Sequence, residues 1–214
     1  GHLQSSKATR QTLLFSATLP GDVMQVAKIA AKPSVKLVDT VGEEEATHMH
    51  VQQQYTITTP EAQPAELFEL VRQMQATGET YKLVVFFTTA RLTQLFAEVF
   101  NKMGISVLEI HSRKSQSHRT NVAEQFRRGS NMILFSSDVS ARGMDYPDVT
   151  AVVQVGMPSD RAQYIHRLGR TARAGKSGGG FLLLADFEAG FVRQLSDLPL
   201  SKRQELAPAV TAQM

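Results

Sequence analysis

The chain has 214 residues, of which 42% are hydrophobic and 20% are charged, and it contains no cysteine. This composition excludes disordered and fibrous proteins, and the lack of cysteine excludes disulfides, thiol nucleophiles and thiolate zinc sites. The formal net charge is only +3, but basic residues concentrate in two stretches, 111–130 and 161–176. Charge alone leaves two interpretations open for these stretches, solvated helix faces or a site for phosphate or nucleic acid.

The sequence predicts neither a membrane partner nor a metal site. Its apolar runs are far shorter than the roughly 20 residues that a membrane span requires, and its six histidines are scattered. The chain begins with Gly1 and His2, without a methionine or a signal peptide, so we expect a cut or tagged end whose natural targeting segment is not visible. The absence of cysteine fits a reducing, intracellular compartment.

Apolar runs alternate with amphipathic stretches, which predicts a mostly parallel sheet covered by helices. In the N-terminal part we expect strands at 12–16 and 35–39, a helix from about 20 to 31 between them, and a polar linker at 40–47. From about residue 50 to 200 the alternation is regular and predicts one doubly wound α/β domain. Its expected strands are 51–56, 82–87, 107–110, 132–136, 151–155 and 180–185, and its expected helices are 65–75, 91–103, 116–127, 160–168 and 187–195.

Polar residues follow several of these strands, where sheets of this kind bind their ligands. They form four sets. The first includes Ser16 and Thr18, and the second is His111, Gln116 and Arg119. The third is Ser137, Asp138, Arg142, Gly143 and Asp145, and the fourth is His166, Arg167, Arg170 and Arg173.

The last of these sets suits an anion. At about 100° per residue, His166, Arg170 and Arg173 share one face of a helix. Three donors without an acid repel one another unless an anion lies between them, and guanidinium groups match phosphate oxygens. The alternative is a basic helix that faces solvent. Gly169 marks a point where the helix can give way to a loop.

The stretch 137–145 places two carboxylates, an arginine and a glycine after a strand that we expect to be buried. Gly143 can bring the backbone close to a ligand, and Asp145 can accept a hydrogen bond from a ribose hydroxyl. The alternative for Asp138 is a cap of a short helix.

Six segments resemble, in order, motifs III, IV, QxxR, IVa, V and VI of the DEAD-box ATP-dependent RNA helicases. They are Ser16-Ala17-Thr18, residues 84–88, Gln116 with Arg119, Phe126 with Gly129, residues 137–145 and residues 166–173. The resemblance covers nearly the whole chain and is nearest to the branch of mitochondrial RNA chaperones that assist intron splicing. The chain departs from the family pattern at Ser112, where glycine is usual, and at Gly156, where aspartate is usual.

The resemblance implies a RecA-like helicase C-terminal domain. Residues 1–40 would be the remnant of a first RecA-like domain, 41–49 the interdomain linker, 50–200 the second RecA-like domain and 201–214 a flexible tail. The family's phosphate-binding loop and acidic metal motif belong to the first domain and do not occur in this sequence. We therefore expect ATP with Mg²⁺ as cofactor, with Mg²⁺ held mainly by the first domain, and no appreciable ATP hydrolysis by this chain alone.

The resemblance also implies roles for individual residues. Arg170 and Arg173 would be arginine fingers that reach the γ-phosphate, and His166 would link motif VI to the first domain. Asp145 and Gly143 would bind ATP together with the two arginines. The RNA-binding residues would be Thr88, Thr89, Arg119, Gly129, Ser137 and Asp138. The residues that couple the two domains would be Ser16, Thr18, Gln116, Arg142 and Arg167.

The implied function is the second domain of an ATP-dependent RNA helicase, which separates short duplexes when it docks on the first domain. Its partners would be the RNA sugar-phosphate backbone and that first domain. The alternative is an isolated α/β module that binds RNA or a protein without catalysis. Apolar residues of segment 11–40 need a cover, so a dimer through this segment is a further hypothesis. The resemblance favours a mitochondrial location over the nucleus or the cytoplasm without deciding between them.

Overall fold

The computed structural model describes residues 12–14, 21–30, 36, 38, 51–138, 146–172 and 177–204. The chain divides into two compact units, Gly1–Ala46 and Thr47–Met214. In the first unit, helix α2 (Gly21–Ala30) lies within the helix that the sequence predicts. The strands expected at 12–16 and 35–39 are described only at residues 12–14, 36 and 38, and none of these residues is in a strand.

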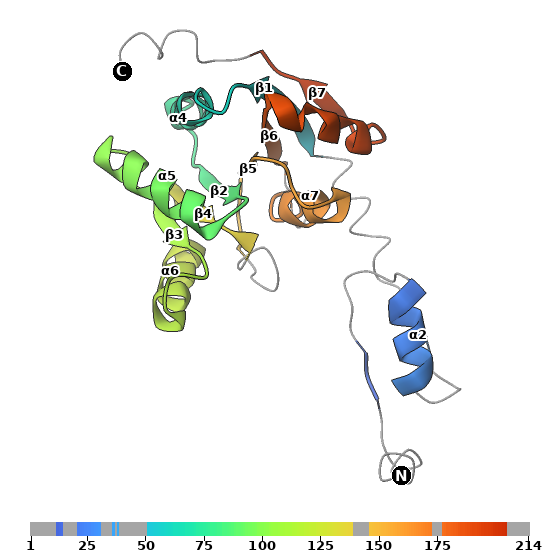
Figure 1. Cartoon of the computed structure of the whole chain (residues 1–214). Coiled ribbons are helices and arrows are strands. Elements are labelled where there is room, and N and C mark those ends of the chain that lie inside the picture. The colour runs from blue at the N-terminus through green and yellow to red at the C-terminus, as the bar shows by residue number, and fades with distance from the viewer. Residues whose placement is uncertain are drawn as a thin grey trace. The chain divides into compact units, whose positions relative to one another are not determined.

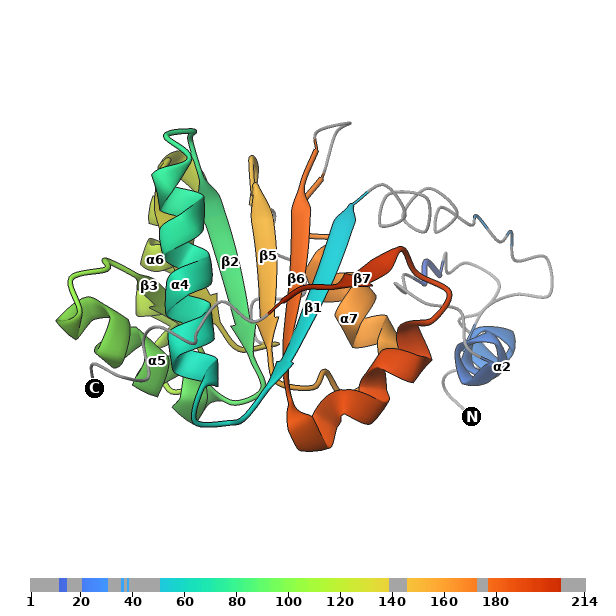
Figure 2. The same ribbon diagram turned by 90° about the horizontal axis from the view of Figure 1, so that it is seen from above.

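The second unit is built on one sheet of seven parallel strands, in the order β3-β4-β2-β5-β6-β1-β7. Figure 2 shows β2, β5, β6 and β1 side by side. The doubly wound parallel sheet predicted from the sequence is therefore confirmed. The strand bounds are β1 (Gln52–Thr58), β2 (Lys82–Phe87), β3 (Leu108–Ile110), β4 (Met132–Ser136), β5 (Ala151–Val155), β6 (Gly179–Ala185) and β7 (Leu200–Lys202).

Helices cover both faces of this sheet because successive side chains of a buried strand point to opposite faces. Leu83, Val85 and Phe87 of β2 pack in the cluster formed with α4 (Gln63–Ala76) and α5 (Ala90–Lys102). Val84 and Phe86 pack on the other face with α6 (Gln116–Arg128). In Figure 1, α4 and α5 lie on one side of the sheet and α7 (Arg161–Leu168) on the other.

The helix expected at 187–195 is present as the 3₁₀ helix η3 (Asp186–Leu195), and Gly190 within it lowers the preference for an α-helix. One expectation about the C-terminal part is wrong. Residues 201 and 202, expected to belong to a tail, lie in β7, which pairs with Gln53–Tyr55 of β1 at the edge of the sheet.

Candidate functional site

The predicted site residues that the structure describes gather mainly at one edge of the sheet. All seven strands are parallel, so the residues that follow β2, β3, β4 and β5 emerge at the same carboxyl edge. The described residues that emerge there, or lie on the helices that begin there, are Thr88, Thr89, Gln116, Arg119, Ser137, Asp138, His166 and Arg167. Arg170 lies in the turn after α7 (Arg161–Leu168), where the next residue, Thr171, donates to the Val149 carbonyl just before β5. The candidate site is therefore the carboxyl edge together with α7 and the turn that follows it.

Gly129 lies elsewhere. It ends α6 and precedes β4, so it sits at the opposite, amino edge of the sheet. The Nζ atom of Lys82, the first residue of β2, donates to the carbonyl of Arg127 at 3.0 Å, which fixes this end of α6 beside the amino edge. A Cβ atom on Gly129 would come within 2.1 Å of Met132 Sδ, so a close approach to β4 accounts for glycine here. The structure does not bring Gly129 to the other predicted RNA-binding residues.

Helix α7 carries the basic residues of the candidate site. Asp160 caps its N-terminus by accepting a hydrogen bond from the Gln163 amide at 2.7 Å. The helix ends at Leu168, and Gly169 is its C-cap. Arg170 therefore lies in the following turn, where its Nε donates to the His166 carbonyl at 3.3 Å. His166 and Arg170 are half-buried neighbours, as predicted, although Arg170 lies beyond the end of the helix, and Arg173 lies outside the described residues.

Arg167, on the same helix, is fully buried and forms an ion pair with Asp138. Its Nε and Nη2 atoms lie 2.8 and 2.7 Å from Asp138 Oδ1. The other carboxylate oxygen accepts from Gln163 Nε2 at 3.0 Å, and the guanidinium lies over the Phe86 ring at 5.5 Å. Burial lowers the pKa of Arg167, and the charge and hydrogen bond of Asp138 oppose that shift.

This ion pair joins two residues to which the resemblance assigns different roles. Asp138 follows β4, and Arg167 lies on the helix after β5, so the pair ties the loop after β4 to α7 within the domain. Sequence analysis placed both residues at the site but missed their contact. The available signal was an acid two residues after a buried strand and an arginine directly before the buried Leu168.

Thr88 and Thr89 follow β2 and are both exposed. Thr89 caps α5, because its hydroxyl accepts from the Leu92 amide at 3.1 Å. Thr88 lies against the end of β5, where Gly156 has a φ of +82° and a Cβ atom would lie 2.8 Å from Thr88 Cγ2. Glycine at 156 thus permits both the left-handed backbone and the close approach of Thr88.

Replacing Gly156 with alanine is expected to lower the free energy of unfolding by about 1–2 kcal/mol. The reason is that left-handed backbone costs a residue with a Cβ about this much free energy. Denaturant unfolding followed by circular dichroism measures this loss. Gly190→Ala is the matched control, since a Cβ there meets nothing within 4 Å, and it should leave stability unchanged or slightly raised. Equal stabilities for the two variants would contradict the backbone strain expected at position 156.

The N-terminus of α6 presents the remaining described residues. Ser115 caps the helix by accepting from the His118 amide at 3.2 Å. Gln116 is exposed, whereas Arg119 is half-buried, and its Nε has no hydrogen-bond partner among the described residues. Ser137 is nearly buried, and its amide donates to the Ile110 carbonyl at 3.2 Å. The Nε of Arg119 is therefore unpaired among the described residues but buried, and Ser137 is largely covered.

Several predicted residues lie outside the described residues: Ser16, Thr18, Arg142, Gly143, Asp145 and Arg173. Within the described ranges, no group of three or more His, Asp or Glu side chains lies close enough to hold a metal ion. No helix in that part of the chain combines the length and apolar character needed to cross a membrane.

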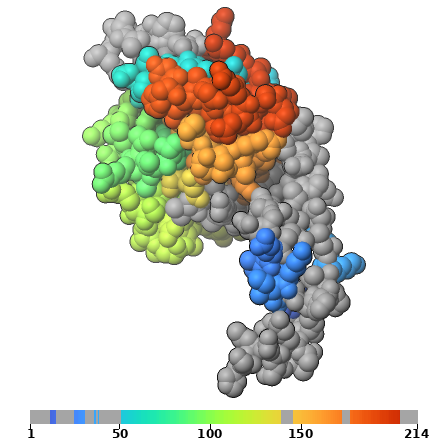
Figure 3. All heavy atoms as spheres, turned by 45° about the vertical axis from the view of Figure 1, so that its right-hand side comes forward, coloured from blue at the N-terminus to red at the C-terminus, as the bar shows by residue number. Residues whose placement is uncertain are grey.

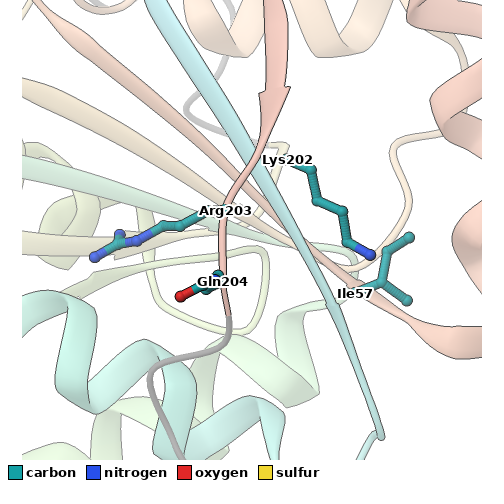
Figure 4. A pocket seen from close by; sticks show the side chains of 4 residues that line it. All are labelled: Ile57, Lys202, Arg203 and Gln204. Carbon is teal, nitrogen blue, oxygen red and sulfur yellow. The ribbon is translucent and has the colours of Figure 1, made fainter.

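A cavity of about 380 Å³ lies away from these residues, beside edge strand β7. It is lined by Ile57, Lys202, Arg203 and Gln204. In Figure 4, the Lys202 side chain points toward Ile57, and the Arg203 side chain points away to the other side. Arg203 is held there by Gln73 Oε1 at 2.5 Å and by the Phe181 ring at 5.6 Å. None of the predicted site residues lines this cavity.

Comparison with known families defines the class of the protein. The family model for the helicase conserved C-terminal domain matches residues 63–175. The chain therefore belongs to the helicase conserved C-terminal domain family, and its sequence relatives place it in the DEAD-box branch of RNA helicases. This confirms the family to which the sequence motifs pointed.

Among the relatives, DEAD-box ATP-dependent RNA helicase 26 of Oryza sativa subsp. japonica is 50% identical over 202 residues, which is 94% of this chain and 37% of that protein. The ATP-dependent RNA helicase mss116, mitochondrial, of Aspergillus fumigatus is 42% identical, over 97% of this chain and 34% of the relative. The chain thus spans about a third of the length of these relatives.

Solved structures show the same fold. Mss116p bound to ssRNA and AMP-PNP is 31% identical with a TM-score of 0.74, over 91% of this chain and 41% of that one. Mss116p DEAD-box helicase domain 2 bound to an RNA duplex is 32% identical with a TM-score of 0.61, over 71% of this chain and 64% of the other. The RecA-like helicase fold expected from the motifs is confirmed.

Proposed function

We propose that the chain supplies the second RecA-like domain of an ATP-dependent RNA helicase, with residues 50–200 as that domain, 1–40 as part of the first domain and 41–49 as the linker. The observation that carries the proposal is the grouping of His166, Arg170 and the Asp138–Arg167 pair, which ties the α7 region to the loop after β4 of a parallel sheet. This group of residues would face the nucleotide when the first domain docks.

In this proposal the arginines of the α7 region stabilise phosphoryl transfer. Charge develops on the equatorial oxygens of the γ-phosphate, and a positioned guanidinium stabilises it. Arg170 fits because its Nε is held by the His166 carbonyl, which orients the guanidinium plane. Arg173 would act beside it, and Asp145 and Gly143 would contact the ribose side of ATP.

The described residues account for only part of a site for ATP with Mg²⁺. They supply cations for the phosphates, whereas no acidic cluster for Mg²⁺ is found among them. Mg²⁺ would therefore be held mainly by the first domain. The residues Ser16, Thr18, Gln116 and Arg142 would couple the two domains. Arg167 would contribute by fixing the α7 region through Asp138.

RNA would lie along the carboxyl edge of the sheet, over Thr88, Thr89, Arg119 and Ser137. Two exposed threonines and a half-buried arginine suit contacts to phosphate and sugar, which give affinity with little sequence preference. Asp138 would act through Arg167, because both of its carboxylate oxygens are occupied within the domain. Gly129 would contribute only through the far end of α6. The solved Mss116p domain 2 on an RNA duplex supports RNA binding by this domain.

The implied mechanism is a switch between open and closed domain pairs. ATP and RNA both favour the closed pair, closure bends one RNA strand so that a short duplex separates, and hydrolysis reopens the cleft. A mitochondrial location is part of the proposal and is supported by the name of the fungal relative.

The exposed apolar residues of the first unit would be covered by the rest of the first domain. Ile29 and Val38 are 75% and 70% exposed, and burying such a side chain is worth roughly 1.5–3 kcal/mol. For the 214-residue chain on its own, a dimer through residues 11–40 would provide the cover.

Binding of a short, fluorescently labelled single-stranded RNA tests the RNA site. The affinity should fall as salt rises from about 50 to 200 mM, with a log–log slope of about −0.7 per neutralised phosphate. Arg119→Ala should weaken binding and reduce the slope by about 0.7 because one phosphate contact is lost. The readout is fluorescence anisotropy at several salt concentrations.

Arg161→Ala is the matched control for this test. Arg161 lies in the first turn of α7, whereas His166 and Arg170 lie in its last turn and just beyond it, and Arg161 pairs at the surface with Asp197 near η3. Figure 3 shows α7, in orange, at the surface beside η3, in red. Its loss should leave the slope unchanged. A chain that does not bind at low salt, or an Arg119→Ala slope equal to that of the unchanged chain, would contradict the proposed RNA surface.

A further inference from the structure

The turn between β3 and α6 is held by His111, a fully buried side chain to which the proposed function gives no role. Its ring Nδ1 accepts a hydrogen bond from the Arg113 amide at 3.2 Å. Its carbonyl accepts from the Lys114 amide at 3.1 Å. The imidazole and the backbone of one residue therefore shape the same turn.

The bond from Arg113 also fixes the tautomer of His111. An Nδ1 that accepts a hydrogen bond carries no proton, so the proton lies on Nε2. Nε2 then donates to Glu109 Oε2 at 3.1 Å. The other oxygen of Glu109 pairs with Lys114 Nζ at 2.5 Å, so Glu109 holds the imidazole and the far end of the turn at once.

This turn lies between two parts of the proposed RNA surface. Directly after it, Ser115 caps α6, and the Ser115 carbonyl accepts the first helical bond of Arg119 at 3.0 Å. Directly before it, the Ile110 carbonyl accepts from the Ser137 amide at 3.2 Å. The path of the turn thus sets where α6 begins relative to the end of β4, and with it the place of Arg119.

We propose that His111 is a positioning residue for RNA binding, which acts through its unprotonated Nδ1 on the 111–115 turn and so on Arg119. The inference rests on the proposed RNA-binding function and goes beyond it, because His111 is buried and does not touch RNA itself. Its contribution is to hold the start of α6 in the geometry that the RNA backbone meets.

A pair of isosteric variants separates this role from simple packing. In His111→Asn the side-chain oxygen replaces Nδ1 and keeps the Arg113 bond, whereas in His111→Gln the amide replaces Nε2 and keeps only the Glu109 bond. Each variant loses one hydrogen bond, so their thermal unfolding midpoints should be similar. We expect the affinity of His111→Asn for the labelled single-stranded RNA to lie within about twofold of that of the unchanged chain. The affinity of His111→Gln should be about tenfold lower, which is the factor that corresponds to the loss of one hydrogen bond of ordinary strength.

Hydrogen exchange at the Arg113 amide provides a second readout that needs no RNA. Exchange should stay slow in His111→Asn and become faster in His111→Gln. Equal RNA affinity for the two variants, whether high or low, would overturn the positioning role, and so would unchanged Arg113 exchange in His111→Gln. If the unchanged chain binds no RNA, both the proposed RNA surface and this inference fail. The exchange result still shows in that case whether His111 holds the 111–115 turn, because it needs no RNA.

Discussion

Replacing Asp138 with alanine is expected to lower the free energy of unfolding by about 3 kcal/mol, because it leaves the fully buried Arg167 without its counter-charge. Breaking a buried ion pair from one side costs about 3–5 kcal/mol. The lower end applies here because the Asp138 side chain is 42% exposed, so water already reaches that carboxylate. Urea unfolding at neutral pH measures the change.

Two further variants identify the cause of this loss. Adding Arg167→Met to Asp138→Ala removes the stranded charge and should restore much of the stability, since an apolar side chain suits the contact with Phe86. Asp197→Ala breaks the surface pair between Asp197 and Arg161, whose side chains are 59% and 39% exposed, respectively. It should lower the free energy of unfolding by less than about 1 kcal/mol. If the double variant were no more stable than Asp138→Ala, the loss would not come from an uncompensated Arg167.

Much of this fold could be predicted because its strands are buried on both faces. A strand such as β2, with six buried residues in a row, appears in the sequence as a continuous apolar run bounded by polar segments. Strand β7 gives no such signal, because it has three residues at the edge of the sheet and two of them are exposed. Its place depends on pairing with β1 across about 150 residues, which no local pattern reveals.

The candidate site could be predicted as a location but not as a set of contacts. The rule that ligands bind at the carboxyl ends of parallel strands indicated Arg119, Asp138 and His166 as site residues, whereas Thr88 came only from the family resemblance. The same rule does not tell which residue is buried. Arg167 lies off the face that His166 and Arg170 share, and only the packing of α7 against the end of β4 shows that it pairs with Asp138.

The largest effect is expected for Arg170→Ala in the two-domain helicase, where RNA-stimulated ATP turnover should fall by about 10³-fold or more. The physical reason is the loss of a guanidinium that stabilises charge on the γ-phosphate only in the transition state, so kcat should fall far more than KM rises. The variant should still fold, because Arg170 is half-buried and lies in the turn after α7, outside the packed helix.

Arg170→Lys and Arg161→Ala complete the experiment. Lysine keeps the charge without the planar fork, so it should recover only a small part of the lost rate. Arg161→Ala removes an exposed arginine from the first turn of the same helix and should leave turnover unchanged. Equal turnover in Arg170→Ala and Arg161→Ala would mean that the basic residues of the α7 region form only a charged surface. The chain would then be better described as an RNA- or protein-binding module without a part in catalysis.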